Sequence, residues 1–245
     1  MRYLVLSDIH ANIDALDAVL ADAGRHGSAE VLMLGDLVGY GAEPNAVIGR
    51  LRELPTAAAI RGNHDRVACG LGGAENFNAA AKSSARVTAQ LLTGENRDYL
   101  RTLPAGPLAV TDWLEICHGT PFDEDEYIFD EMDAVYALRA ASRPICLFGH
   151  THAPYGIRMT GDEVDYVDVS PGAAIPLRDD VLYLANVGSV GQPRDGDPRA
   201  AYGVLDADAR SLTCYRVPYD VEKAQARIRE AGFPDALARR LGIGR

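Results

Sequence analysis

Short apolar segments alternate with longer amphipathic segments in the first part of the chain. The apolar segments have the length of buried strands and are Tyr3–Leu6, Val31–Leu34 and Ala57–Ile60. Between the first two, Asn12–Arg25 has apolar residues at helical spacing, and a second helical pattern begins at Pro44 and stops before Pro55. This order of strand, helix, strand, helix and strand predicts a mainly parallel sheet with helices packed against it.

The rest of the chain predicts further helices and then a series of antiparallel strands. We expect helices over 74–93, 95–103 and Glu131–Ala141, a hairpin over Leu108–Cys117 that turns near Asp112, and a buried strand at Ile145–Phe148. After Gly149, short apolar runs are separated by turn residues, which is typical of antiparallel strands. These runs are Tyr155–Met159, Val164–Val169, Leu182–Val187, Ala201–Leu205 and Leu212–Val217. The chain closes with helical patterns at Asp220–Ala231 and Pro234–Leu241.

The parallel and antiparallel parts of the predicted fold each have an apolar sheet face that must be covered. The sequence has no internal repeat, low-complexity segment or linker between them. We therefore expect a single domain over residues 1–245, in which two sheets pack together and helices lie outside.

Composition and charge restrict the classes of partner. The chain has 245 residues, a hydrophobic fraction of 47% and a formal net charge of -11. This charge repels nucleic acid and anionic membranes, and no cluster of lysines and arginines reverses it locally. No apolar run approaches the ~20 residues that span a bilayer, no signal peptide precedes the first strand, and the four cysteines are scattered, as expected of buried residues in a reducing compartment. We expect a cytoplasmic protein without membrane association or a dedicated nucleic-acid site.

Five apolar runs end in side chains that can bind a metal. With the residues that follow, they are Leu4-Val5-Leu6-Ser7-Asp8-Ile9-His10, Met33-Leu34-Gly35-Asp36, Ile60-Arg61-Gly62-Asn63-His64-Asp65, Ile116-Cys117-His118-Gly119 and Leu147-Phe148-Gly149-His150-Thr151-His152. Ligand sites of open α/β sheets lie just beyond the carboxyl ends of the strands, so the five segments can meet in one place. Five of the six histidines of the chain belong to this set.

The residue types in these segments suit divalent transition metals. Imidazole and carboxylate ligands without thiolate favour Mn²⁺, Fe, Zn²⁺, Co²⁺ or Ni²⁺. Asp8-x-His10 and His150-x-His152 place two ligands on one side of an extended segment, because side chains alternate along a strand. One carboxylate with two oxygens can also bridge two ions about 3.5–4 Å apart.

Single residues of this set also fit ordinary structural roles. Asp8 or Asp36 alone is typical of a turn or a helix cap, and His118 alone is typical of a histidine packed at a strand end. The string Gly62-Asn63-His64-Asp65, however, is expected only about 0.002 times by chance at this composition. Five independent strand ends that all carry ligand-type residues therefore indicate a metal site.

The motifs Asp8-x-His10, Gly35-Asp36, Gly62-Asn63-His64-Asp65, His118-Gly119 and Gly149-His150-Thr151-His152, in this order, resemble the calcineurin-like metallophosphoesterase superfamily. The segment Asn186–Arg194 resembles a later part of the small prokaryotic phosphodiesterase branch, so the resemblance covers most of the chain. It implies a four-layer αββα sandwich with two packed mixed sheets, which agrees with the two sheets inferred from the pattern. It also implies a hydrolase that cleaves phosphoester bonds with two divalent metal ions.

The resemblance assigns roles to the individual residues. Asp8, His10, Asp36 and His152 are expected to hold one ion, and Asp36, Asn63, His118 and His150 the other, with Asp36 as the bridge. A water molecule activated by the two ions would attack the phosphorus in line. His64 is expected to donate a proton to the leaving oxygen, since it follows Asn63 but points the other way along an extended segment.

Two positions differ from the protein Ser/Thr phosphatases of this superfamily. Those enzymes carry an acidic residue three positions after the bridging aspartate, followed by an arginine, and here the two positions are Gly39 and Tyr40. The sequence therefore favours small phosphodiesters or dinucleoside polyphosphates over phosphoproteins. Asp65 could support His64 in place of the missing acid, or it could begin a helix.

Other functions and site residues fit parts of the pattern. The alternatives are the same chemistry on phosphomonoesters or phosphoproteins, a protein-binding scaffold, and a nucleotide-binding module that does not cleave its ligand. A scaffold would be expected to have lost His64 or several ligands, and none is lost. Arg61, Arg66, Arg194 and Arg199 are either phosphate-binding or ordinary structural arginines. The loop Gly188–Arg194 either approaches a ligand or forms a simple turn.

Overall fold

The computed structural model describes residues 1–245, whose strands form two six-stranded sheets. The first sheet has the order β3-β2-β1-β11-β12-β9 and contains β1 (Arg2–Leu6), β2 (Glu30–Leu34), β3 (Thr56–Ile60), β9 (Ala174–Pro176), β11 (Ala200–Asp206) and β12 (Ser211–Val217). The second has the order β4-β5-β6-β10-β7-β8 and contains β4 (Leu108–Ala109), β5 (Leu114–Ile116), β6 (Ile145–Leu147), β7 (Tyr155–Thr160), β8 (Glu163–Tyr166) and β10 (Leu182–Asn186). Strands β1, β2 and β3 pair in parallel, as do β5, β6 and β10, and the other pairs are antiparallel.

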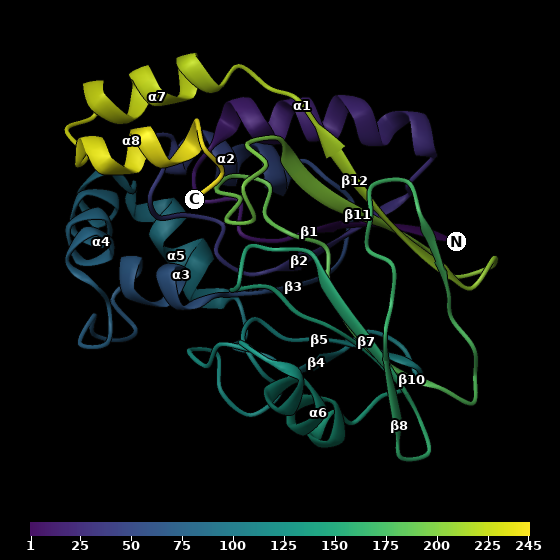
Figure 1. Cartoon of the computed structure of the whole chain (residues 1–245). Helices are drawn as coiled ribbons and strands as arrows, with labels where there is room; N and C mark the ends of the chain where they lie inside the picture. The colour runs from purple at the N-terminus through teal and green to yellow at the C-terminus, as the bar shows by residue number, and fades with distance from the viewer.

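Helices cover the outer sides of the two sheets. They are α1 (Ile13–Ala23), α2 (Pro44–Arg52), α3 (Asn63–Ala68), α4 (Ala79–Leu91), α5 (Gly94–Thr102), α6 (Glu131–Ala140), α7 (Val221–Glu230) and α8 (Asp235–Leu241), with a 3₁₀ turn at Gly24–His26. Figure 1 shows α1 and α7 on one side of the molecule and α6 on the other, with the sheets between them. This order of layers confirms the expected αββα sandwich. None of the helices has the length and apolar character that crossing a bilayer requires.

Strand β1 shows how the sequence places the first sheet between two apolar layers. Tyr3 and Val5 point toward the second sheet and join a buried cluster that includes Leu147 of β6. Leu4 and Leu6 point the opposite way, into the cluster beneath α1 and α2. The apolar runs of the parallel strands are continuous because both of their faces are buried.

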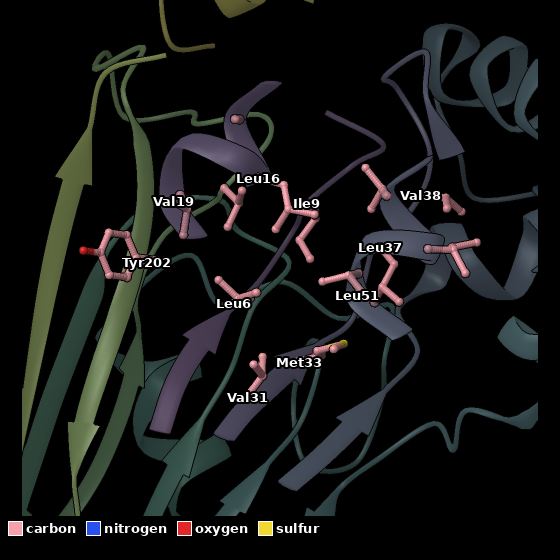
Figure 2. Close-up of a cluster of buried hydrophobic side chains, with 14 of the residues drawn as sticks. Leu6, Ile9, Leu16, Val19, Val31, Met33, Leu37, Val38, Leu51 and Tyr202 are labelled. Atoms are coloured by element: carbon pink, nitrogen blue, oxygen red, sulfur yellow. The ribbon is translucent and has the colours of Figure 1, made fainter. Parts of the chain in front are cut away.

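Figure 2 shows the cluster between the first sheet and its helices. Leu16 and Val19 of α1 face Leu6 of β1, and each of the three side chains has 0% exposure. Full burial of one such side chain stabilises the fold by roughly 1.5–3 kcal/mol. Tyr202 lies at the edge of the cluster with its hydroxyl directed away from it, where the hydroxyl donates a hydrogen bond to Asp22 at 2.6 Å.

The structure adds two short elements that the sequence pattern did not predict. Strand β9 has three residues and helix α3 has six, which is too short for a periodic pattern to be detected. The helix expected over 74–93 begins only at Ala79, because the side chain of Asn78 caps it by accepting a hydrogen bond from the backbone N–H of Ala81. Each sheet mixes strands from the parallel and antiparallel parts of the chain, since β11 pairs with β1 and β10 pairs with β6.

All four cysteines are free and buried, as the sequence predicts. Burial raises the pKa of Cys214 to about 12, so its thiol stays protonated at ordinary pH and is a poor nucleophile. We expect the native protein to leave Cys214 unmodified by iodoacetamide at pH 8, whereas the guanidinium-unfolded chain is modified at all four cysteines. Mass spectrometry of digested protein locates the modified residues, and rapid modification of Cys214 in the native protein would contradict its burial.

Candidate metal centre

The ligand-type residues of the five strand ends meet at one edge of the sandwich. They are Asp8 and His10 after β1, Asp36 after β2, Asn63 after β3, His118 after β5, and His150 and His152 after β6. Each of them is at most 6% exposed. Because these strands lie in parallel runs of their two sheets, their carboxyl ends bring the side chains to a common place.

Two overlapping groups of donor atoms form within this set, and the atoms of each group lie within 4.8 Å of one another. The first group comes from Asp8, His10, Asp36 and His152, and the second from Asp36, His118 and His150. Asp36 belongs to both, with Oδ2 3.5 Å from Nε2 of His10 and 3.4 Å from Nε2 of His118. Oδ1 of Asn63 lies 3.3 Å from Nε2 of His118. The structure therefore brings together all seven residues that the sequence singled out as ligands.

The donor atoms are arranged to bind cations and not to hydrogen-bond to one another. Oδ2 of Asp36 is buried without a hydrogen-bond partner, which is costly for a carboxylate oxygen in the interior. Nε2 of His10 and Nε2 of His152 lie only 3.0 Å apart. An unpartnered carboxylate oxygen beside converging imidazole nitrogens is a donor set typical of divalent transition metals.

Backbone carbonyls fix the orientation of the four imidazoles. In three rings Nδ1 hydrogen-bonds to a carbonyl oxygen: His10 to Val38 at 3.1 Å, His118 to Leu34 at 2.8 Å and His152 to Gln192 at 2.6 Å. His150 is reversed, with Nε2 3.2 Å from the carbonyl oxygen of Asp125. A carbonyl oxygen accepts only from a protonated nitrogen, so the other nitrogen of each ring is left to bind a metal.

Burial keeps most of these imidazoles neutral. It lowers the pKa of His10, His150 and His152 well below the ordinary value, so these rings have a free lone pair at neutral pH. For His118, burial lowers the pKa, but the carboxylate of Asp36 has the opposite effect, and the pKa rises to about 10. The negative charge of Asp36 thus stabilises a neighbouring positive charge, here that of the protonated His118.

The backbone around the ligands is unusual. All but one of the non-glycine residues with positive φ lie in the ligand-bearing loops, namely Asp8, His10, Ala11, Asp36, Tyr40, His150 and His152. The expectation that Asp8-x-His10 and His150-x-His152 follow extended segments is therefore wrong. Hydrogen bonds between loops stabilise these conformations, such as the one from the backbone N–H of His10 to the carbonyl of Asp36 at 2.9 Å. Strained backbone of this kind clusters at functional sites.

His64 lies in the first turn of α3 and not on an extended segment, which corrects the prediction. Asp65 caps the start of this helix, because its carboxylate accepts a hydrogen bond from the backbone N–H of Gly62 at 3.0 Å. The same carboxylate accepts hydrogen bonds from the backbone N–H groups of Leu37 and Val38 at 3.1 and 2.9 Å. Asp65 therefore joins α3 to the Asp36 loop and does not support the imidazole of His64.

The imidazole of His64 lies beside the donor groups in an aromatic environment. Its centroid is 5.1 Å from the ring of His10, 4.4 Å from that of Tyr40 and 4.5 Å from that of Phe77. Nδ1 is buried and has no hydrogen-bond partner. Burial lowers the pKa of His64 to about 4, so the ring is neutral at pH 7 in the free protein.

Gly39 allows the ring of His64 to occupy this position. Its φ of +94° is rare for residues with a side chain, and a Cβ would lie 2.6 Å from Nδ1 of His64. We expect Gly39→Ala to lower the free energy of unfolding by about 1–3 kcal/mol and to reduce activity by displacing the imidazole. Gly49→Ala in α2 is the control, because nothing lies within 4 Å of its Cβ position and alanine favours the helix. Chemical denaturation measures both, and equal stability of the two variants would contradict the expectation.

Two of the candidate arginines hold a loop against the centre. Arg61 and Arg66 both contact Glu124, at 3.4 and 2.7 Å, and Arg66 also binds Asp125 at 2.8 Å. The carbonyl of Asp125 in turn orients His150. These ion pairs engage both guanidinium groups, so their contribution to the site is to position this loop.

The other two candidate arginines differ from each other. Arg199 forms an ion pair with Asp197 at 2.6 Å and its side chain is 48% exposed. Arg194 has no carboxylate within ion-pair distance, and its guanidinium carbon lies 5.7 Å from the ring centroid of Tyr40. Among the four candidates, Arg194 therefore lies near the donor groups and has no carboxylate partner that would compete with a phosphate.

The loop Gly188–Arg194 braces two ligands. The hydroxyl of Ser189 and the backbone N–H of Gly191 donate hydrogen bonds to the carbonyl of Asp8 at 2.8 and 3.0 Å. The carbonyl of Gln192 accepts from His152. The loop is therefore part of the site and not a simple turn.

Several residues that support the centre carry no signal in the sequence. The carbonyls of Val38 and Leu34 orient ligands, but every residue has a carbonyl, and only the fold decides which one faces an imidazole. The hydroxyl of Ser7 donates to Oδ2 of Asp8 at 2.7 Å. The ring of Tyr127 lies 3.8 Å from that of His150 between centroids.

Comparison with known proteins agrees with this geometry. Residues 1–210 match the family model of the calcineurin-like phosphoesterase superfamily domain. An uncharacterised protein of Methanocaldococcus jannaschii is 34% identical over 98% of this chain and 97% of its own. The crystal structure of a metallophosphoesterase from Sphaerobacter thermophilus is 37% identical, with a TM-score of 0.87 over 100% of this chain and 99% of that one. A hypothetical protein of Pyrococcus horikoshii has the same fold at 19% identity, with a TM-score of 0.80 over 100% and 98% of the two chains. The chain therefore belongs to the calcineurin-like phosphoesterase superfamily and is a hydrolase that acts on phosphoester bonds.

Proposed function

We propose that the protein hydrolyses small phosphodiesters or dinucleoside polyphosphates with a pair of divalent cations, drawn from Mn²⁺, Zn²⁺, Fe, Co²⁺ and Ni²⁺. The observation that carries this proposal is the pair of buried donor groups that share Asp36. Asp8, His10, Asp36 and His152 would hold one cation, and Asp36, Asn63, His118 and His150 the other. When bound, such ions act as Lewis acids toward phosphoryl oxygens and lower the pKa of water.

Backbone hydrogen bonds orient the carboxylates that would bind these ions. Asp36 is held in place because its Oδ1 accepts a hydrogen bond from the backbone N–H of His64 at 2.9 Å, which leaves Oδ2 for the centre. The backbone N–H of His150 likewise donates to Oδ1 of Asp8 at 3.1 Å. Both carboxylates are therefore oriented before any ion or substrate binds, which reduces the cost of organising the site.

His64 is the proposed proton donor to the leaving oxygen. Its Nδ1 is buried against Gly39, so Nε2 is the nitrogen that can reach a substrate. The negative charge of a bound phosphoryl group would favour the protonated imidazole and oppose the effect of burial on its pKa. A proton transfer of this kind contributes about 10²–10⁴-fold to the rate.

A small substrate suits this centre better than a folded phosphoprotein. His64 is 5% exposed and the ligands are at most 6% exposed, so little of the centre is accessible to the surface of a folded partner. Tyr40 packs against His10 with 4.7 Å between ring centroids, at the position where protein phosphatases of the superfamily have an arginine. Gly39, in place of their acidic residue, leaves Nδ1 of His64 without a carboxylate partner.

Hydrolysis of bis-p-nitrophenyl phosphate tests the proposed function. The purified protein with Mn²⁺ is expected to release p-nitrophenol, EDTA is expected to stop the reaction, and added metal is expected to restore it. Protein carrying Asp36→Asn and purified in the same way controls for contaminating phosphatases. No turnover with any of Mn²⁺, Co²⁺, Ni²⁺ or Zn²⁺ would overturn the proposal and favour a scaffold or a binding module.

A further inference from the structure

Two arginines without an aspartate or glutamate partner lie beside the metal centre. The guanidinium carbons of Arg194 and Arg240 are 5.7 and 5.9 Å from the ring centroid of Tyr40. The same ring lies 4.7 Å from the ring of His10 and 4.4 Å from that of His64. The ring of Tyr40 thus lies close to both positive charges, to the ligand His10 and to the proposed proton donor.

The polar atoms of these two arginines are poorly satisfied within the protein. Nε of Arg194 is buried without a hydrogen-bond partner, and Nη2 donates only to the side chain of Gln192, at 3.1 Å. Nε of Arg240 donates to the main-chain oxygen of Arg245, the last residue of the chain, at 2.7 Å. No aspartate or glutamate carboxylate forms an ion pair with its guanidinium group. Burial lowers the pKa of Arg240, and the charge of Arg194 lowers it further. Keeping two like charges together without an aspartate or glutamate beside them is costly for the free protein.

The two arginines come from parts of the chain that are far apart in sequence. Arg194 lies in the loop after β10, whereas Arg240 lies in the last turn of α8, beyond the residues 1–210 that match the family model. The backbone N–H of Gly196 donates to the carbonyl of Gly244 at 2.9 Å and joins the two segments. Figure 1 shows the C-terminus beside this loop. The fold therefore holds the two guanidinium groups in a fixed relation to the centre.

We propose that Arg194 and Arg240, which both lie near the ring of Tyr40, bind a second phosphoryl group of the substrate, adjacent to the one that is hydrolysed. This inference rests on the proposed function and narrows the substrate to compounds with a chain of at least two phosphoryl groups, such as dinucleoside polyphosphates. Guanidinium groups bind phosphate oxygens through paired charge-assisted hydrogen bonds. A second phosphoryl group would supply negative charge and further acceptors beside the two guanidinium groups.

Substitution of Arg240 tests the inference. This residue belongs to α8, whereas Arg194 belongs to the loop that contacts the ligands Asp8 and His152, so a change at Arg240 disturbs the metal centre less. We compare kcat/KM for bis-p-nitrophenyl phosphate, which has one phosphoryl group, and for diadenosine tetraphosphate, with Mn²⁺ in excess over both. Arg240→Gln is expected to lower kcat/KM for the tetraphosphate at least tenfold more than for the diester, and Arg240→Lys is expected to restore part of the loss.

Arg239→Gln is the matched control, since this neighbouring arginine on α8 is 72% exposed and pairs with Asp235 at 3.0 Å on the surface. It is expected to leave both substrates unaffected. An equal loss of kcat/KM on both substrates in Arg240→Gln would overturn the inference and indicate a structural role. Unchanged kcat/KM on both substrates would overturn it as well. If the wild-type protein cleaves the diester but the tetraphosphate is neither cleaved nor a competitive inhibitor, the second site is refuted while the proposed function stands. Absence of all turnover would instead refute the proposed function.

Discussion

Asp36→Asn is expected to lower kcat/KM on phosphodiesters by about 10³-fold or more and to reduce the metal content of the protein. Asp36 is the residue that both donor groups share, so its loss affects both proposed ions. The change is nearly isosteric, and Oδ1 of the asparagine can still accept the hydrogen bond from the backbone N–H of His64. The loss of one negative charge therefore dominates. Removal of a single electrostatic group from an active site costs about 10²–10³-fold in rate, and the loss here is expected at or above the upper end because both proposed ions are affected.

Metal analysis of dialysed protein separates this expectation from a folding defect. The wild-type chain should retain about two ions after loading, and Asp36→Asn should retain less than one. Asp17→Asn is the control, because Asp17 is 58% exposed and pairs only with Arg50 at 3.5 Å. Full metal content together with full activity in Asp36→Asn would show that Asp36 does not bridge the two groups.

His64→Ala is expected to keep the metals but to lose about 10²–10⁴-fold in kcat on substrates with an alcohol leaving group. His64 belongs to neither donor group, so metal content should not change. A proton donor matters most when the leaving oxygen is strongly basic. The loss should therefore be much smaller with p-nitrophenyl esters, whose phenolate leaves readily without protonation.

Phe77→Leu provides the matched control for His64→Ala. Its ring packs against that of His64 with 4.5 Å between centroids but carries no ionisable nitrogen. If His64→Ala and Phe77→Leu lose kcat to a similar extent, and each loses as much with p-nitrophenol as with alcohol leaving groups, His64 acts only through packing. Loss of metal from His64→Ala would mean that His64 supports the ligands and is not the proton donor.

The sequence was sufficient to predict the layers and to pick out the ligand-type residues that the structure brings together. The apolar runs of β1, β2 and β3 indicated a parallel sheet because strands buried on both faces leave continuous apolar segments. The ligand-type residues could be found because the carboxyl ends of parallel strands share one edge of a sheet. Their roles as ligands, and that of His64 as proton donor, are predictions that the experiments above test.

The backbone conformation around the ligands could not be predicted from the pattern of apolar and polar residues. Asp8 and His10 have positive φ values of 52° and 49°, and these depend on hydrogen bonds to the loop of Asp36 that form only in the folded protein. Helix α3 has six residues, and the carboxylate of Asp65 that caps its start also accepts hydrogen bonds from the neighbouring loop. Both features depend on contacts between segments that are distant in sequence.

The sequence by itself determined which residues could bind cations and at which strand ends they lie, because residue type and alternation are local properties of the chain. The tertiary structure decided what surrounds them. Arg66 is engaged by carboxylates while Arg194 is not, and Arg240 reaches the ring of Tyr40 from the last helix. Ion pairing, burial and the meeting of distant loops depend on the position of every other element, and no periodic pattern in the chain records them.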